Sequence, residues 1–161
     1  MATDMTIKID GIKGESKLKD HTDEIDLLAW SWGQSQSGTF GGGGGGGAGK
    51  VTAQDLSLQK YVDKSSPELL LACANGKHIK DAVLTVRKAG EKPLEYITIT
   101  VEKILVTSIS TGGSGGEDRL TESVTLNFAK MKIEYQEQDD TGSPKGGKVT
   151  YAWDYQQNVK P

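Results

Sequence analysis

A glycine-rich stretch in the first third of the chain could hold a phosphate group. Residues 37–52 read SGTFGGGGGGGAGKVT. From Gly44 the stretch matches G-x-x-x-x-G-K, with Gly49 and Lys50 in the last two positions. A phosphate-binding loop of this kind needs Ser or Thr after the lysine and a helix whose amino terminus receives the phosphate. Val51 stands there instead, and strand-like spacing follows. Seven successive glycines also satisfy any glycine pattern, so the sequence favours a structural loop.

The other residue types that catalyse reactions or bind metals do not form recognisable sets. His21 and His78 lie in separate segments without partners at metal-ligand spacing, and the single cysteine cannot complete a zinc site. Acidic residues cluster at 23–26 and 117–118, where we expect them to be solvated or paired, the second cluster with Arg119. The motif G-x-S-x-G is absent. The sequence therefore predicts a protein that is not an enzyme, with no catalytic residues, cofactor or metal.

Composition narrows the class of protein further. The 161 residues suffice for one domain. The content of charged residues (25%) and of hydrophobic residues (35%) is ordinary for a globular protein. The net charge of -3 offers no broad basic surface for nucleic acid. No stretch approaches the roughly 18 apolar residues of a membrane span, and the first residues lack the pattern of a signal peptide. We expect no nucleic-acid partner and no direct membrane insertion.

The elements that must position the glycine-rich loops are mostly strands. Apolar and polar residues alternate at 5–9 and 82–86, as half-buried strands require. Two longer candidates, at 97–106 and 124–135, alternate and then change phase partway. A β-bulge or bend has this effect and lets long antiparallel strands curl into a barrel, whereas the alternative is two short strands in each case.

One segment predicts a helix. SSPELLLACANGK offers Ser66 as N-cap, Pro67 at the first helical position and a stop at 75–76. Apolar residues at 69–73 surround much of the helix, which is typical of a core helix covering one wall or end of a barrel. The expected fold is mainly β, a compact antiparallel β-barrel with one short α-helix.

The segment EIDLLAWSWG at 24–33 carries apolar residues on both faces of a strand. Under strict alternation Leu27 shares one face with Ser31, while Trp30 and Trp32 lie on the other. Only one face of a barrel strand looks into the core, so the second must meet a helix, a loop or another subunit. Trp30 and Trp32 are therefore candidate interface residues, with coverage by the predicted helix as the alternative.

Four longer stretches, in the right order and within a matching total length, resemble one family. They are IDGIKGES (9–16), EIDLLAWSWG (24–33), QDLSLQKYVDKSSPELLLACANGKHI (54–79) and STGGSGGEDRLTESVTLNF (110–128). The chain looks like the haemolysin-coregulated protein (Hcp) family of the bacterial type VI secretion system.

The resemblance implies one structural tube domain over residues 1–161, without a fused effector domain. Homohexameric rings would stack into a hollow tube in the cytoplasm, and the tube would then be secreted without a signal peptide, with effectors in its lumen. The implied partners are the chain itself, a contractile sheath, a spike protein and small effector proteins.

The resemblance also implies roles for particular residues. The loop from Gly38 to Val51 would be the extended loop of the family, which reaches an adjoining subunit or ring, and Ser31 is a candidate lumen-facing cargo contact. The expected contact residues are Gly41, Gly42, Gly43, Gly44, Gly45, Gly46, Gly47, Ala48, Gly49 and Lys50. A β-rich ligand-binding module without catalytic activity remains the alternative.

Overall fold

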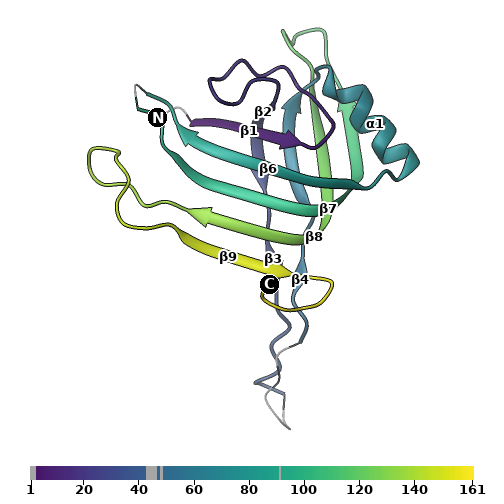
Figure 1. Ribbon diagram of the computed structural model, residues 1–161. Coiled ribbons are helices and arrows are strands. Elements are labelled where there is room, and N and C mark those ends of the chain that lie inside the picture. The colour runs from purple at the N-terminus through teal and green to yellow at the C-terminus, as the bar shows by residue number, and fades with distance from the viewer. Residues whose placement is uncertain (1–2, 43–46, 48, 91) are drawn as a thin grey trace.

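Long antiparallel strands account for most of the chain (Figure 1). The computed structural model describes residues 3–42, 47, 49–90 and 92–161. In this part of the chain the elements are β1 (Thr3–Ile9), β2 (Ile25–Ser31), β3 (Gln34–Ser35), β4 (Thr52–Ala53), β5 (Leu56–Tyr61), α1 (Ser65–Asn75), β6 (Ile79–Lys88), β7 (Glu95–Gly112), β8 (Thr121–Tyr135) and β9 (Val149–Asp154).

Strand pairing closes the main sheet into a barrel. The order is β5-β2-β1-β6-β7-β8-β9, and β5 also pairs with the first part of β8, where Leu58 lies opposite Val124. Six strands therefore form a closed ring, and β9 extends the sheet from the second part of β8, with Ile133 opposite Tyr151. Closure removes the free edges of the six barrel strands. The predicted antiparallel β-barrel with one helix is confirmed.

The two phase changes seen in the sequence lie within continuous, bent strands. In β7 the successive residues 102–103 are both exposed, and in β8 the successive residues 128–129 are both buried, with Phe128 opposite Ile104. The register between the two strands is the same on either side of this point, so both strands bend together. Lys103 has a positive φ of 58°, and a true register shift follows between Val106 and Ser108. The predicted bend is confirmed, and the alternative of paired short strands is wrong.

The barrel encloses a continuous apolar core. Its fully buried members include Ile7, Leu58, Leu84, Ile99, Ile104, Leu126 and Leu69, the last from α1. Alternation along each strand supplies these inward side chains, because successive side chains of a strand point to opposite faces.

The helix occupies the predicted place but begins differently. Ser66 lies inside the first turn and is not the N-cap; the carboxylate of Asp63 accepts a hydrogen bond from the backbone N–H of Ser65 at 2.9 Å instead. Gly76 ends the helix in the left-handed conformation, φ 65°, as expected for a glycine stop.

One face of α1 packs against β7 and the other remains open. Leu69 and Ala72 are buried, whereas Leu70 and Leu71 are 43% and 62% exposed. The helix therefore covers part of the barrel with one stripe, and the expectation of a helix buried over much of its circumference is wrong.

Candidate functional site

The glycine-rich segment forms the end of an extension that leaves the barrel between β2 and β5. Two short strands begin it, with Gln34 opposite Ala53 and Ser35 opposite Thr52. Figure 1 shows this extension projecting well beyond the barrel. Near its end the side chain of Phe40 is 89% exposed, the highest value among the exposed large hydrophobic residues of the described chain.

Part of the predicted contact loop is described and part is not. Gly41, Gly42, Gly47, Gly49 and Lys50 are described, and all five are exposed. The predicted contact residues Gly43, Gly44, Gly45, Gly46 and Ala48 lie outside the described residues. The Thr39 hydroxyl donates to the carbonyl oxygen of Gly47 at 2.7 Å, which ties the two sides of the extension together.

The segment after the loop excludes the phosphate-binding alternative. Lys50 is followed by strand β4 and then β5, and α1 begins only at Ser65. No helix amino terminus therefore follows the glycines directly, which a nucleotide-binding loop requires.

The base of the extension is held firmly to the barrel. The backbone N–H of Gln54 donates to the carbonyl oxygen of Gly33 at 2.9 Å, and the indole N–H of Trp32 donates to the carbonyl oxygen of Gln54, also at 2.9 Å. The side-chain oxygen of Gln34 accepts from the hydroxyls of Tyr151 and Tyr155 at 3.0 and 2.8 Å. The direction in which the extension leaves the barrel is thus set by polar contacts at its base.

The expected division of β2 into two faces is wrong. A register shift between Leu27 and Ala29 places Leu27 opposite Lys60 and Trp30 opposite Leu58. Both partners are buried, so Leu27 and Trp30 face the core on either side of the irregularity, and Leu28 and Ala29 are both exposed.

The two tryptophans therefore contact the barrel interior. Trp30 and Trp32 are half-buried and pack against the core, and the ring of Trp32 lies 6.4 Å from that of Phe128. They need no cover by α1, which packs against β7. Ser31 is exposed on β2, opposite Ser57 of β5. The interface role of Trp30 and Trp32 and the cargo role of Ser31 remain predictions.

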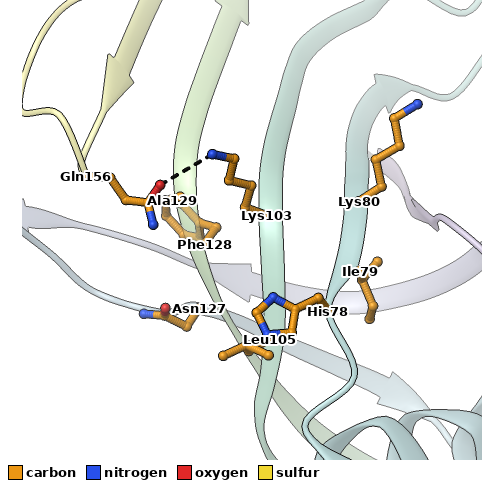
Figure 2. Close-up of a pocket in the computed structure, with 9 residues that line it drawn as sticks. All are labelled: His78, Ile79, Lys80, Lys103, Leu105, Asn127, Phe128, Ala129 and Gln156. Atoms are coloured by element: carbon orange, nitrogen blue, oxygen red, sulfur yellow. Dashed lines mark hydrogen bonds between the residues drawn. The ribbon is translucent and has the colours of Figure 1, made fainter.

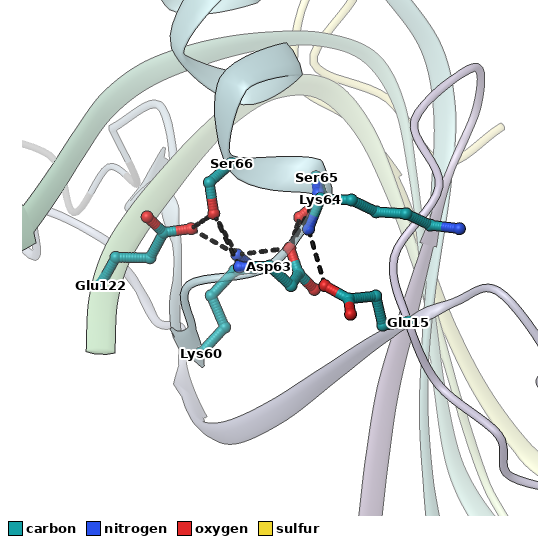
Figure 3. Close-up of polar contacts among 7 residues, drawn as sticks. All are labelled: Glu15, Lys60, Asp63, Lys64, Ser65, Ser66 and Glu122. Carbon is teal, nitrogen blue, oxygen red and sulfur yellow. Dashed lines mark hydrogen bonds and ion pairs between the residues drawn. The ribbon is translucent and has the colours of Figure 1, made fainter. Parts of the chain in front are cut away.

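A buried polar cluster joins α1 to the barrel (Figure 3). Lys60 is fully buried and forms ion pairs with Glu122 of β8 and, at 3.1 Å, with Asp63. The ammonium also donates to the hydroxyl of Ser66 at 3.2 Å, and that hydroxyl contacts Glu122. A sequence signal existed, because Lys60 continues the period-two series of buried residues Leu56 and Leu58.

A second cluster surrounds His21, which is also buried. Its Nδ1 lies 2.9 Å from a carboxylate oxygen of Glu24, and its Nε2 lies 2.6 Å from Glu95 at the start of β7. Burial alone would lower the pKa of His21, but the hydrogen bonds and charges of Glu95 and Glu24 outweigh it, so the pKa is raised above its ordinary value. Glu95 lies 74 positions further along the chain, so sequence reasoning missed this contact.

The remaining acidic residues do not assemble into a metal site. Among the described residues, no three or more His, Cys, Asp or Glu side chains are arranged to hold a metal ion. Arg119 lies over the ring of Tyr61, 3.7 Å from its centre. Glu117 and Asp118 are exposed, which agrees with the solvated alternative, and within the described residues no ion pair joins them to Arg119. In the same described ranges, no helix is long and apolar enough to cross a membrane.

Comparison with known proteins gives consistent matches over the chain. The model of a family described as "Type VI secretion system effector, Hcp" matches residues 6–135. A curated relative from Pseudomonas aeruginosa, "Protein hcp1", is 61% identical over 161 residues, which cover 99% of each chain.

Solved structures match the fold over its full extent. The crystal structure of Hcp1 from Salmonella typhimurium is 39% identical with a TM-score of 0.84, and each chain is fully covered. A structure of a type six secretion system protein is 28% identical with a TM-score of 0.93, covering 99% of this chain and 100% of the other. A type VI secretion system effector from Yersinia pestis is 37% identical with a TM-score of 0.77, covering 94% and 99%.

Proposed function

Because this chain belongs to the Hcp family of type VI secretion system proteins, we propose that it assembles into homohexameric rings that stack into a hollow tube. The protein is a secreted structural tube component and not an enzyme. A separate ligand-binding module is not favoured by these matches. In this assembly the extension at residues 33–54 contacts an adjoining subunit or ring.

The observation that carries this proposal is the exposed aromatic side chain on a projecting, anchored extension. Phe40 is 89% exposed, and a large apolar group in water is stabilised when a partner surface covers it. The contacts of Gln34 and Trp32 hold the base of the extension in place, so assembly does not need to order the base. A contact between different surfaces of identical subunits can close into a ring or continue as a stack.

Two variants test the role of the extension. Deletion of several glycines from Gly41 to Gly47, or Phe40→Ala, should impair ring stacking or secretion without unfolding the barrel. Val149→Ala is a matched control, because Val149 is an exposed apolar residue, 70% exposed, on β9. Negative-stain images with mass measurement count rings and stacks, and circular dichroism reports folding. If the glycine deletion unfolds the monomer, or if both the deletion and Phe40→Ala leave stacking unchanged, the proposal fails.

We further propose that Ser31 faces the lumen and contacts cargo. The side chain is exposed and small, so a bulky group there would narrow the lumen without disturbing the core. Ser31→Trp should reduce the amount of effector that co-purifies with intact rings. Unchanged co-purification, with rings of normal size, would exclude this role.

The sheath, the spike protein and small effectors are proposed partners, and export is proposed to occur without removal of an amino-terminal segment. Mass spectrometry of the chain from culture supernatant tests the second point. Recovery of the chain with its first residues supports uncleaved export, and a consistently truncated amino terminus contradicts it.

A further inference from the structure

A pocket of about 470 Å³ lies on the barrel wall beside the bend of β7 (Figure 2). Leu105 of β7 and Phe128 of β8 provide apolar lining, and Gln156, just after β9, lies at its border. Figure 2 shows Lys103 extending from β7 toward Gln156, with His78 and Leu105 lower in the same pocket. The pocket therefore joins an apolar wall to polar groups from separate elements.

The lysines of this pocket lack a carboxylate partner. Within the described ranges, neither Lys80 nor Lys103 forms an ion pair, whereas Lys130, Lys132 and Lys148 on or beside the neighbouring strands do. The only hydrogen bond found for the ammonium of Lys103 in this part of the chain is a long one, 3.4 Å, to the side-chain oxygen of Gln156. On a chain of net charge -3, the ammonium of Lys103 beside an apolar wall, with a second lysine, Lys80, on the adjoining strand, forms a local site for an anion.

The backbone at Lys103 is unusual for a lysine. Its φ of 58° lies in the left-handed region, where glycine is accommodated without strain and a side chain with a Cβ is not. The bend itself therefore does not call for a lysine. The side chain at this position nevertheless carries a charge to the pocket border.

We propose that this pocket binds an acidic peptide segment of a partner protein. A carboxylate of the segment pairs with the ammonium of Lys103, in place of its weak contact to Gln156, and Lys80 adds attraction at longer range. An adjacent apolar side chain of the segment covers the half-buried Leu105, beside the buried Phe128. An inorganic anion pairs with the ammonium group but leaves the apolar lining in water. A pocket that offers both an ammonium group and an apolar lining therefore favours a peptide.

Methyl NMR with two matched peptides tests the proposal on the full-length protein. The probe is acetyl-Leu-Glu-Leu-amide, and the comparison is acetyl-Leu-Gln-Leu-amide, which has the same shape without the charge. The methyl signals of Ile79 and Leu105, both lining the pocket, should shift saturably with the glutamate peptide. The glutamine peptide should bind about tenfold more weakly, since it loses a charge-assisted hydrogen bond.

Two variants separate the site from general surface charge. Lys103→Gly removes the ammonium and keeps the bend unstrained, so it should fold normally and weaken binding of the glutamate peptide by about tenfold. Lys132→Gln, on β8 and paired with Glu134, is the matched control and should leave binding unchanged. Equal responses to both peptides, no saturable response, or equal effects of the two substitutions would overturn the proposal. A saturable response to inorganic phosphate that matches that of the glutamate peptide would also overturn it, because the apolar lining would then contribute nothing.

Discussion

The environment of His21 predicts that the folded protein loses stability as the pH rises. The imidazole lies between Glu24 and Glu95, and its pKa is raised above the ordinary 6.5. A group whose pKa is higher in the folded state binds its proton more tightly there than in the unfolded chain. Its contribution is therefore fully present below pH 6.5 and is lost as the pH rises through the raised pKa.

Glu95→Gln separates the contribution of the carboxylate charge of Glu95 from that of its hydrogen bond to His21. The amide oxygen that the substitution introduces can still accept a hydrogen bond from Nε2 of His21, which lies 2.6 Å from the carboxylate of Glu95 in the wild type, but the ion pair is gone. A hydrogen bond to a charged partner contributes about 1 kcal/mol more than a neutral one, and the half-exposed side chain of Glu95 reduces that difference. We expect the variant to be less stable by somewhat less than about 1 kcal/mol below pH 6.5, and to differ little from wild type at high pH.

Urea unfolding over a pH series measures this effect. Protein concentration must stay constant, because assembly makes apparent stability depend on concentration. His78→Gln is the matched control, since His78 is exposed and should leave the pH dependence unchanged. If wild type and Glu95→Gln lose stability equally as the pH rises through this range, the contact does not carry the proton linkage and the reasoning is wrong.

Three further predictions concern folding and can be checked by the same urea titration. Lys60→Met should destabilise the protein by about 3–5 kcal/mol, because it leaves Glu122 buried without its ion-pair partner. Adding Glu122→Gln should recover part of the lost stability. An unchanged stability of the single variant would contradict this prediction. Gly14→Ala should cost about 1–3 kcal/mol because an added Cβ would lie 2.5 Å from a backbone carbonyl oxygen, whereas Gly116→Ala has open space and should be neutral; equal effects would refute the steric reason. Tyr155→Phe should cost about 1 kcal/mol by removing a hydrogen bond at the base of the extension, and an unchanged midpoint would show that water replaces it fully.

Most of the fold could be predicted from the sequence because the strand pattern is strong where only one face is buried. The alternation at 82–86 and the phase changes in β7 and β8 indicated long curved strands, and the glycine stop at Gly76 ended the helix where expected. The face assignment of β2 failed since the irregularity between Leu27 and Ala29 leaves both adjacent apolar residues, Leu28 and Ala29, outside. Strict alternation cannot detect such a shift when both faces already carry apolar residues.

In the candidate sites, too, some features could be predicted from the sequence and others could not. The glycine-rich segment, including Lys50, was recognisable as a loop between strands because Val51 and its successors continue with strand spacing, and the family resemblance was carried by contiguous residues. Loops and contiguous motifs can be recognised in the sequence because the residues that define them are neighbours along the chain. By contrast, neither the pairing of His21 with Glu95 nor that of Lys60 with Glu122 has any local signature.

The sequence by itself therefore determined the barrel, the helix, the projecting glycine-rich segment and the family, since each depends on periodicity, turn residues or contiguous motifs. The tertiary structure alone decided which charges are buried together and where a cationic pocket opens beside the bend at Lys103. The physical reason is that closing the barrel through β5 and β8 brings residues more than 60 positions apart within ion-pair distance. Free energies of burial and pairing at that range depend on the folded geometry and not on local spacing.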